Sequence, residues 1–232
     1  MSVSAIEVPR GRVPSHLIDL FEEQEATLFR RNFHSSVSMD RKLFQKVFMN
    51  TLLSKLIRYY ERPEVSLEFG TNIPFLIIIP HTFLNRQRQL ALISNDGIRG
   101  EPILNLREPI NNRGRVRPDR PYLLLDIDPG TQMMWMCIND SIEHIKSKHR
   151  GGLTLDEGIA LAAHRSDILA NHGIDLISTL TSDNLTPFIR YRNNSFIVGK
   201  HFPNTPSPPS DPFSSASSLG IIALPEPKPI TA

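Results

Sequence analysis

Two short apolar segments place the strongest constraint on the fold of this chain. Residues 73–80 read IPFLIIIP, and residues 121–127 read PYLLLDI. Neither reaches the roughly 20 apolar residues that a membrane-spanning helix needs. Short apolar runs that are rich in β-branched residues and end at prolines favour strands buried on both faces. We therefore predict two core strands that lie side by side, covered by helices on at least one face.

Helical periodicity predicts two helices ahead of the first strand. Apolar residues recur at helical spacing in residues 14–31 and, more strongly, in residues 39–60. Asp40 is placed to cap the second helix, and Pro63 prevents much continuation beyond it. These helices are expected to form an N-terminal hairpin, about residues 14–62, that packs on the sheet.

The sequence up to residue 202 predicts further short helices and strands. Thr154 and Glu157 form a capping-box pattern that opens a helix. Residues 132–138 are expected to return as a strand beside residues 121–127, and extended pieces within residues 176–198 to form a meander on the edge of the sheet. The predicted fold class is α+β, a helical hairpin packed on a mixed β-sheet, in one domain of residues 1–202 whose sheet-containing core spans about residues 70–202.

The C-terminal residues 203–232 differ in composition from the rest of the chain. Eight prolines and a cluster of serines fall in this stretch, a composition that favours disorder or loosely docked extended structure. Residues 219–224 are apolar enough to dock as an edge strand. From composition alone, truncation after Phe202 is expected to leave most of the stability intact.

Charge and cysteine content restrict the ligands, cross-links and cellular location that can be expected for the protein. Lys and Arg total 26 against 24 acids, a formal net charge of +2, which argues against nucleic-acid binding by the whole molecule but leaves a local basic patch open. Cys137 is the single cysteine, so neither an internal disulfide nor a cysteine zinc cluster can form. The N-terminal residues lack the pattern of a secretory signal. We expect a cytoplasmic protein without membrane association.

The order of the motifs resembles that of a known family. IPFLIIIP is followed by RPYLLLDIDPGTQM, then LTLDEGIALAAHRSDIL, then a polar region that ends in SSASS, over residues 73–218. This series is similar to that of an uncharacterised bacterial domain-of-unknown-function family. The resemblance implies a shared fold and supplies no activity, mechanism or cofactor.

One candidate site consists of acid–base residues near the ends of the two apolar strands. Asp126 and Asp128 end the second segment, and His81 follows the first. Carboxylates at the end of a strand in an α/β sheet often hold a metal ion or act as a general base, and a nearby histidine could serve as their partner. The alternative is structural, because Asp128 with Pro129 and Gly130 is a common turn sequence and a loop histidine needs no special role.

A second candidate site is the basic loop at residues 107–120. Its arginines are Arg107, Arg113, Arg115, Arg117 and Arg120. Bidentate guanidinium contacts could hold a phosphate or an RNA backbone, with Arg113, Arg115 and Arg117 as the candidates. Against this, Tyr122 is the one aromatic residue nearby, and a basic loop is commonly just a solvated surface.

Familiar catalytic patterns are missing from the sequence. No nucleophile elbow, phosphate-binding P-loop or dinucleotide fingerprint follows any predicted strand. His144 and His149 are five residues apart, a spacing that puts them on different faces of a helix, so no metal site and no cofactor are predicted. The leading hypothesis is a binding or interaction module of unknown ligand, with a phosphate or RNA binder and an enzyme as alternatives. The sequence does not indicate a partner or an oligomeric state.

Overall fold

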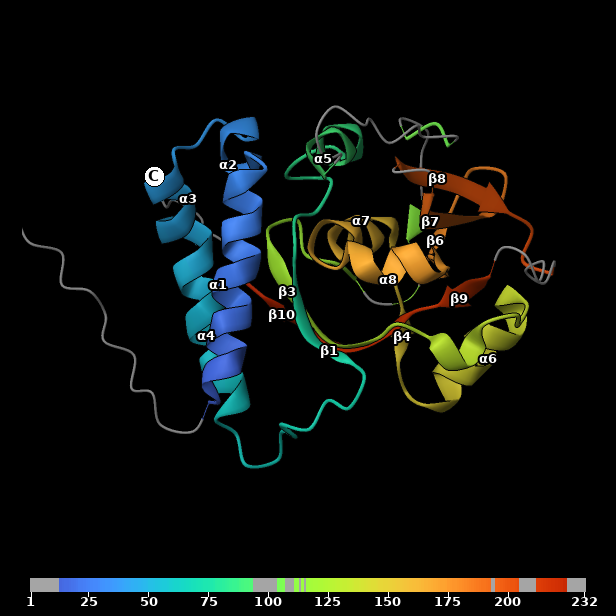
Figure 1. The fold of residues 1–232 in the computed structure, drawn as a ribbon, viewed down its shortest axis with the longest axis horizontal. Coiled ribbons are helices and arrows are strands. Elements are labelled where there is room, and N and C mark those ends of the chain that lie inside the picture. Colours follow the sequence, from blue (N-terminus) through green and yellow to red (C-terminus); the bar gives the residue numbers. More distant parts are fainter. Residues whose placement is uncertain are drawn as a thin grey trace, which may run out of the picture.

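The chain folds into layers of helix and sheet, as Figure 1 shows. The structure, a computed structural model, describes residues 13–93, 104–106, 111–112, 114, 116–192, 195–204 and 212–224. N-terminal helices cover one face of a first sheet, helix α7 (Leu155–His164) covers its other face, and a second sheet lies beyond α7. The predicted α+β class is confirmed.

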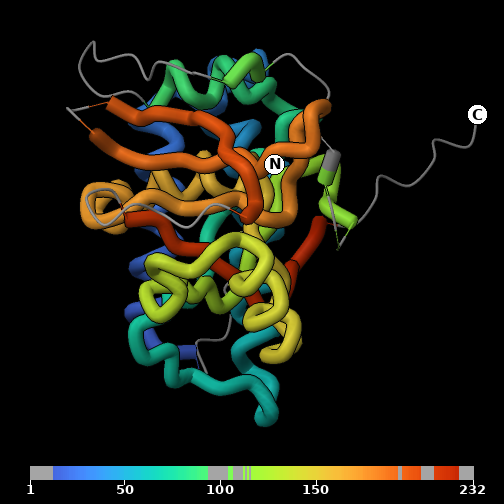
Figure 2. The backbone as a smooth tube through the Cα atoms, turned by 90° about the vertical axis from the view of Figure 1, so that its right-hand side faces the viewer, coloured from blue at the N-terminus to red at the C-terminus, as the bar shows by residue number. Residues whose placement is uncertain are grey.

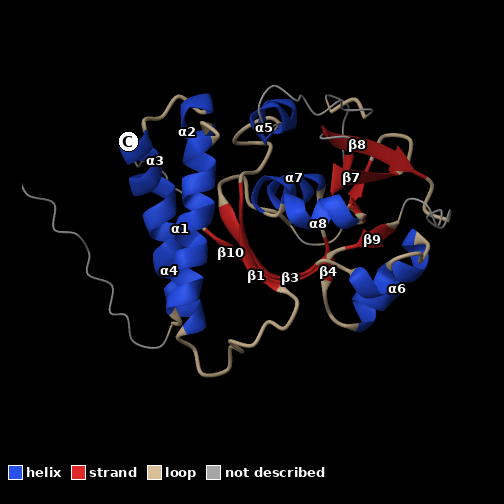
Figure 3. Ribbon diagram, viewed as in Figure 1, coloured by secondary structure: helices blue, strands red, loops and turns tan. Residues whose placement is uncertain are grey.

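The N-terminal hairpin forms from residues that the helical periodicity singled out. Helix α1 (Ser15–Arg30) leads through the short α2 (Phe33–Ser36) to a second helical stretch made of α3 (Arg41–Phe44), the π-helical turn η1 (Gln45–Met49) and α4 (Asn50–Tyr60). The Asp40 carboxylate caps this stretch by accepting from the Leu43 backbone N–H at 2.8 Å. Figure 3 shows α1 and α4 side by side against the first sheet, which confirms the predicted hairpin.

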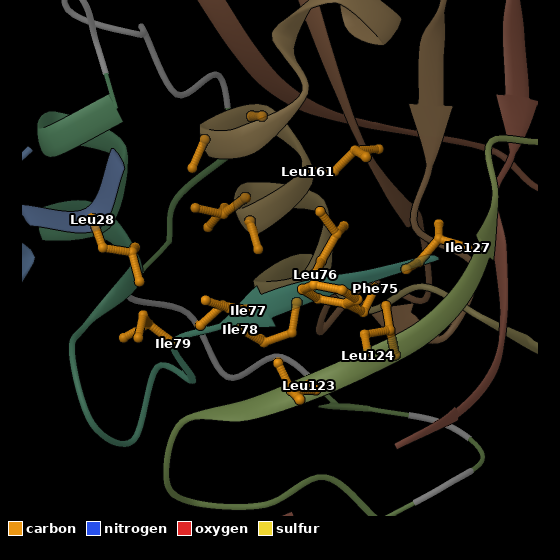
Figure 4. Close-up of a cluster of buried hydrophobic side chains, with 14 of the residues drawn as sticks. Leu28, Phe75, Leu76, Ile77, Ile78, Ile79, Leu123, Leu124, Ile127 and Leu161 are labelled. Carbon is orange, nitrogen blue, oxygen red and sulfur yellow. The ribbon is translucent and has the colours of Figure 1, made fainter. Parts of the chain in front are cut away.

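The two apolar segments are the central strands of the first sheet. Strand β1 (Ile73–Ile78) pairs antiparallel with β3 (Tyr122–Asp128), with Ile73 opposite Ile127 and Ile78 opposite Tyr122. The sheet order is β1-β3-β10-β4, where β10 is Ser217–Ala223 and β4 is Gly151–Gly152. Side chains from both strands meet those of α1 and α7 in one apolar core (Figure 4). The two predicted strands therefore lie side by side and are covered on both faces.

The free edge of β1 is bonded by a side chain of α1. Gln24, only 3% exposed, donates from Nε2 to the carbonyl of Phe75 at 2.9 Å and accepts at Oε1 from the N–H of Ile77 at 2.8 Å. Its amide thus takes the two hydrogen bonds that a further strand would make. This pair of bonds fastens α1 to the sheet and blocks strand addition at that position.

Helix α7 lies between the two sheets and is almost completely buried. Its residues Leu155 to Ala163 are all buried, and Gly158 is required because a Cβ there would lie 2.5 Å from the side chain of Leu176. The second sheet has the order β8-β7-β5-β9, from β8 (Ser195–His201), β7 (Thr186–Arg192), β5 (Gly173–Asp175) and β9 (Phe213–Ser215). Figure 2 views the molecule from this side. The meander expected on the edge of the first sheet is instead a separate sheet.

The remaining elements connect these layers. They are α5 (Arg86–Ile93), η2 (Thr131–Met133), α6 (Ile138–Ser147), α8 (Ser166–Asn171) and the pair β2 (Asn111–Asn112) with β6 (Thr179–Leu180). The prediction of a strand at residues 132–138 is wrong. A 3-10 turn lies at the start of this segment, and the φ of 75° at Trp135 is incompatible with an extended strand. Helix α6 begins at Ile138. Within the described residues, no helix is long and apolar enough to cross a membrane.

Residues beyond 202 contribute strands to both sheets. β9 pairs parallel with β5 in the second sheet, and β10 pairs with β3 in the first. The predicted edge strand at residues 219–224 corresponds to the partly exposed half of β10, but the preceding residues from Phe213 to Ser218 are all buried. Residues 205–211 and 225–232 of the predicted tail lie outside the described residues. Composition did not predict the burial of residues 213–218, because serine counts as polar in the sequence although its small side chain can pack in a core.

The packing of β9 and β10 reverses the expectation for truncation. A chain that ends at Phe202 loses both strands and leaves the edge of β3 that pairs with β10 without its partner. We expect it to stay unfolded or to melt at least about 10 °C lower, because several kcal/mol of packing would be lost. A chain that ends at Leu224 keeps both strands and is the control. Melting by circular dichroism distinguishes them, and equal midpoints would show that the two strands contribute little.

His164, the last residue of α7, is partly buried, and its ring nitrogens face the interior. Both ring nitrogens are inaccessible and lack a hydrogen-bond partner among the described residues. Burial lowers the pKa of His164 to about 4, and the nearby backbone of Ile77 only partly opposes this shift. The folded protein therefore holds a neutral imidazole at a pH where the unfolded chain already binds a proton.

His164 should make stability depend on pH in the mildly acidic range. Its pKa is lowered in the fold, so the free energy of unfolding should fall as the pH drops from about 6.5 to about 4, by about 3 kcal/mol in total. His164→Leu should remove that part of the slope, and His16→Leu on the exposed face of α1 controls for loss of an imidazole. Urea denaturation at a series of pH values measures both. If the free energy of unfolding changed with pH in the same way in the wild type and in His164→Leu, His164 would not be the origin of the pH dependence.

Candidate functional site

The first turn of α7 carries two acidic residues into the interior. Thr154 and Glu157 form the predicted capping box, in which Thr154 Oγ1 accepts from the Glu157 N–H at 3.4 Å and Glu157 accepts from the Thr154 N–H at 2.7 Å. Asp156 is 4% exposed and Glu157 is 0% exposed. Buried carboxylates are costly unless they are paired, so each must find a cation or several donors.

Asp156 is paired with His81 and Arg86. Its Oδ2 lies 2.7 Å from His81 Nδ1 and accepts from the His81 backbone N–H at 3.1 Å, while Oδ1 accepts from Arg86 Nε at 2.6 Å. Burial alone would raise the pKa of Asp156, but the hydrogen bonds from His81 and the charge of Arg86 outweigh it and lower the pKa. His81 Nδ1 also lies 3.0 Å from Nη2 of Arg86, so one ring nitrogen contacts both partners of this ion pair.

Glu157 is paired with Arg117 and Tyr122. Arg117 donates from Nε to Oε1 at 2.6 Å and from Nη2 to Oε2 at 3.2 Å, and the Tyr122 hydroxyl donates to Oε1 at 3.0 Å. Arg117 Nη2 also lies 3.3 Å from the carbonyl of Gly152. Burial lowers the pKa of Arg117, but the Glu157 carboxylate outweighs this and raises it. Burial, reinforced by Glu157, also raises the pKa of Tyr122 well above its usual value.

The basic loop is attached to this turn at two points, Asn112 and Arg117. On one side, Asn112 in β2 pairs with Thr179 in β6, and Thr179 Oγ1 accepts from the Leu155 N–H at 2.9 Å. On the other side, Arg117 is bound to Glu157. Between the two attachments, Val116 is 94% exposed. The described part of the loop therefore projects from the start of α7 into solvent.

The arginines of the loop differ in their placement. Arg117 is largely buried in its ion pair, so it anchors the loop and is poorly placed to contact a ligand. Arg120 lies over the ring of Phe48, with its guanidinium carbon 5.3 Å from the ring centre. Arg107, Arg113 and Arg115 lie outside the described residues.

Asp126 and Asp128 are at the opposite end of β3 from His81. Asp126 accepts from Arg150 Nη1 and from Asn72 Nδ2, both at 2.7 Å. Arg150 also donates to the Asp126 carbonyl and, from Nε, to Ser217 Oγ at 2.9 Å, so it links β3 to β10. Asp128 accepts from the Gly130 N–H at 2.8 Å, which is the turn role weighed as the alternative. The structure does not bring these two carboxylates together with His81.

A third buried carboxylate is paired in the other sheet. Asp175 of β5 lies 2.6 Å from Nε2 of His201 at the end of β8. Burial raises the pKa of Asp175, and His201 opposes the increase. Among the described residues, no three His, Cys, Asp or Glu side chains gather as metal ligands.

Sequence reasoning identified His81 and Arg117 but not their partners. Asp156 is 75 residues from His81 and 70 from Arg86, and Glu157 is 40 residues from Arg117. Local patterns cannot indicate such pairs. One signal was present, because two acids in the first turn of an otherwise apolar helix must be buried with it and therefore need cations.

Comparison with known proteins identifies a family for this chain. The chain belongs to DUF5701, a family of unknown function, whose model matches residues 31–187. This match includes His81, Arg86, Arg117 and the first turn of α7. Neither a curated protein nor a solved structure is similar enough to match the chain.

The buried pair of Arg117 and Glu157 should contribute strongly to stability. Arg117→Met leaves a fully buried carboxylate without its cation, which should lower the free energy of unfolding by about 3–5 kcal/mol. Arg165→Met breaks the exposed pair with Asp167 and should cost under about 1 kcal/mol. Urea denaturation at pH 7 compares the two. Adding Glu157→Gln to Arg117→Met should recover part of the loss, and equal costs for the two single variants would contradict the assignment.

Proposed function

We propose that the chain is a binding module for phosphate-bearing ligands, which it contacts through Arg113 and Arg115 of the basic loop. The observation that carries the proposal is the attachment of this loop to the buried first turn of α7, directly at Arg117 and through Thr179 at Asn112. In the sequence, both arginines lie between the two attachments, on either side of the exposed Gly114. A bacterial, cytoplasmic setting remains a prediction from the sequence.

Charge pairing at the base of the loop supports the proposal. Asp156 and Glu157 are each matched by an arginine, Arg86 and Arg117. These acids therefore cancel little of the positive charge that Arg113 and Arg115 bring to the loop. Guanidinium groups bind phosphate oxygens in bidentate geometry, and a loop with fixed ends loses less conformational entropy on binding than a free one.

The enzyme hypothesis receives less support. It requires Asp126, Asp128 and His81 in one cleft, within reach of a shared substrate. His81 follows the end of β1 that faces Tyr122, whereas Asp126 is four residues further along β3. At about 3.3 Å per strand residue this separation is roughly 13 Å. His81 Nδ1 instead lies 2.7 Å from the carboxylate of Asp156.

Removing the loop arginines should weaken binding to phosphate polymers. A fluorescently labelled single-stranded RNA oligonucleotide, measured by anisotropy at several salt concentrations, is the probe. Arg113→Ala with Arg115→Ala should reduce affinity at low salt by at least about tenfold. It should also reduce the slope of log K against log salt by about 1.4, since each phosphate contact contributes about 0.7.

The matched control removes two positive charges elsewhere. Lys146→Ala with Lys148→Ala on and after α6 changes the net charge equally on exposed residues. It should leave the salt slope close to that of the wild type. Equal losses of RNA affinity in the two double variants would mean that binding depends on net charge alone. The proposal would also be wrong if the wild type did not bind RNA at low salt.

A further inference from the structure

A hollow of about 230 Å³ lies between the end of α8 and strand β7. Figure 3 shows these two elements next to each other. The polar residues that line the hollow are Asn171, His172, Arg190, Tyr191 and Arg192. None of them belongs to the charged cluster at α7 or to the basic loop. We propose that this hollow binds a small hydroxylated phosphate ester, the size of a triose or pentose phosphate.

Two arginines of β7 suit the phosphate group. Arg190 and Arg192 are two residues apart, so their side chains leave the same face of the strand. The guanidinium carbon of Arg190 lies 5.7 Å from the ring centre of Phe188 and 5.6 Å from that of Phe213. Contact with aromatic faces holds the position of a guanidinium while its N–H groups point outward in its own plane. β7 pairs with β8 along its whole length, which fixes the backbone that carries both arginines.

His172 and the end of α8 suit the hydroxyl groups. His172 is 7% exposed, and its Nε2 lies 3.4 Å from the carbonyl of Pro129. Because a carbonyl only accepts, Nε2 carries the proton and Nδ1 is the acceptor of the neutral ring. Burial lowers the pKa of His172, which keeps the ring neutral. The last carbonyls of a helix lack partners within the helix, so Leu169 and Ala170 add acceptors at the wall.

The size of the hollow restricts the ligand. Its volume is about 230 Å³. Pockets for drug-sized ligands begin near about 300 Å³. A nucleotide would therefore extend beyond the hollow, whereas a short phosphorylated polyol fits it. The arginines of β7 donate hydrogen bonds, and the groups at the end of α8 accept them. The ligand should therefore carry an anion at one end and hydroxyl groups at the other.

Isothermal titration of the full chain with four probes tests this proposal. The probes are glycerol 3-phosphate, ribose 5-phosphate, inorganic phosphate and ribose. At least one phosphate ester should bind about tenfold or more tightly than both inorganic phosphate and ribose, because only the ester meets both ends of the hollow. Arg192→Ala should weaken that binding by at least about tenfold.

Two further variants make the test specific. Ala170→Phe fills the hollow from the exposed wall, leaves both arginines in place and should abolish binding. Arg113→Ala with Arg115→Ala in the basic loop should bind the ester like the wild type, which separates this site from the proposed loop function. Thermal melts confirm that each variant is folded. Binding of neither ester, equal binding of inorganic phosphate, or unchanged binding by folded Ala170→Phe would each overturn the proposal.

Discussion

The structure depends on the burial of two charges at the start of α7. This helix is apolar along its length and lies between two sheets, so its first turn is buried together with Asp156 and Glu157. A carboxylate in such a place is tolerated only with matching donors. Arg86 and Arg117 supply the charge, and Thr154, Tyr122 and His81 complete the hydrogen bonds.

These pairings position elements that are distant in sequence. Asp156 holds the turn after β1 and the first residue of α5, while Glu157 holds the start of β3 and the segment before it. The basic loop takes its position from the same turn of helix. A network that serves the fold thus also sets where the candidate ligand contacts lie, and this is why Arg117 anchors the loop rather than contacting a ligand.

Local patterns predicted the elements whose cause is local. The helical stripe of residues 39–60, the capping box at Thr154 and the two apolar strands all appear as expected. Predictions failed where a distant contact decides the outcome. Residues 132–138 do not form a strand because β10, more than 80 residues later, takes the place beside β3 that they were expected to occupy. Gly130 also approaches the backbone of Ser215 too closely for any side chain.

The sequence by itself determined which segments are apolar and which residues carry charge, because apolar content and helix or strand period are properties of neighbouring residues. It therefore identified the two core strands, the α+β class and the two separate residues His81 and Arg117. Only the tertiary structure decided that each of these two faces an acid of α7, and that Asp126 belongs with Arg150. The physical reason is that ion pairs form between side chains brought together by packing, and packing joins residues tens of positions apart without leaving a local pattern.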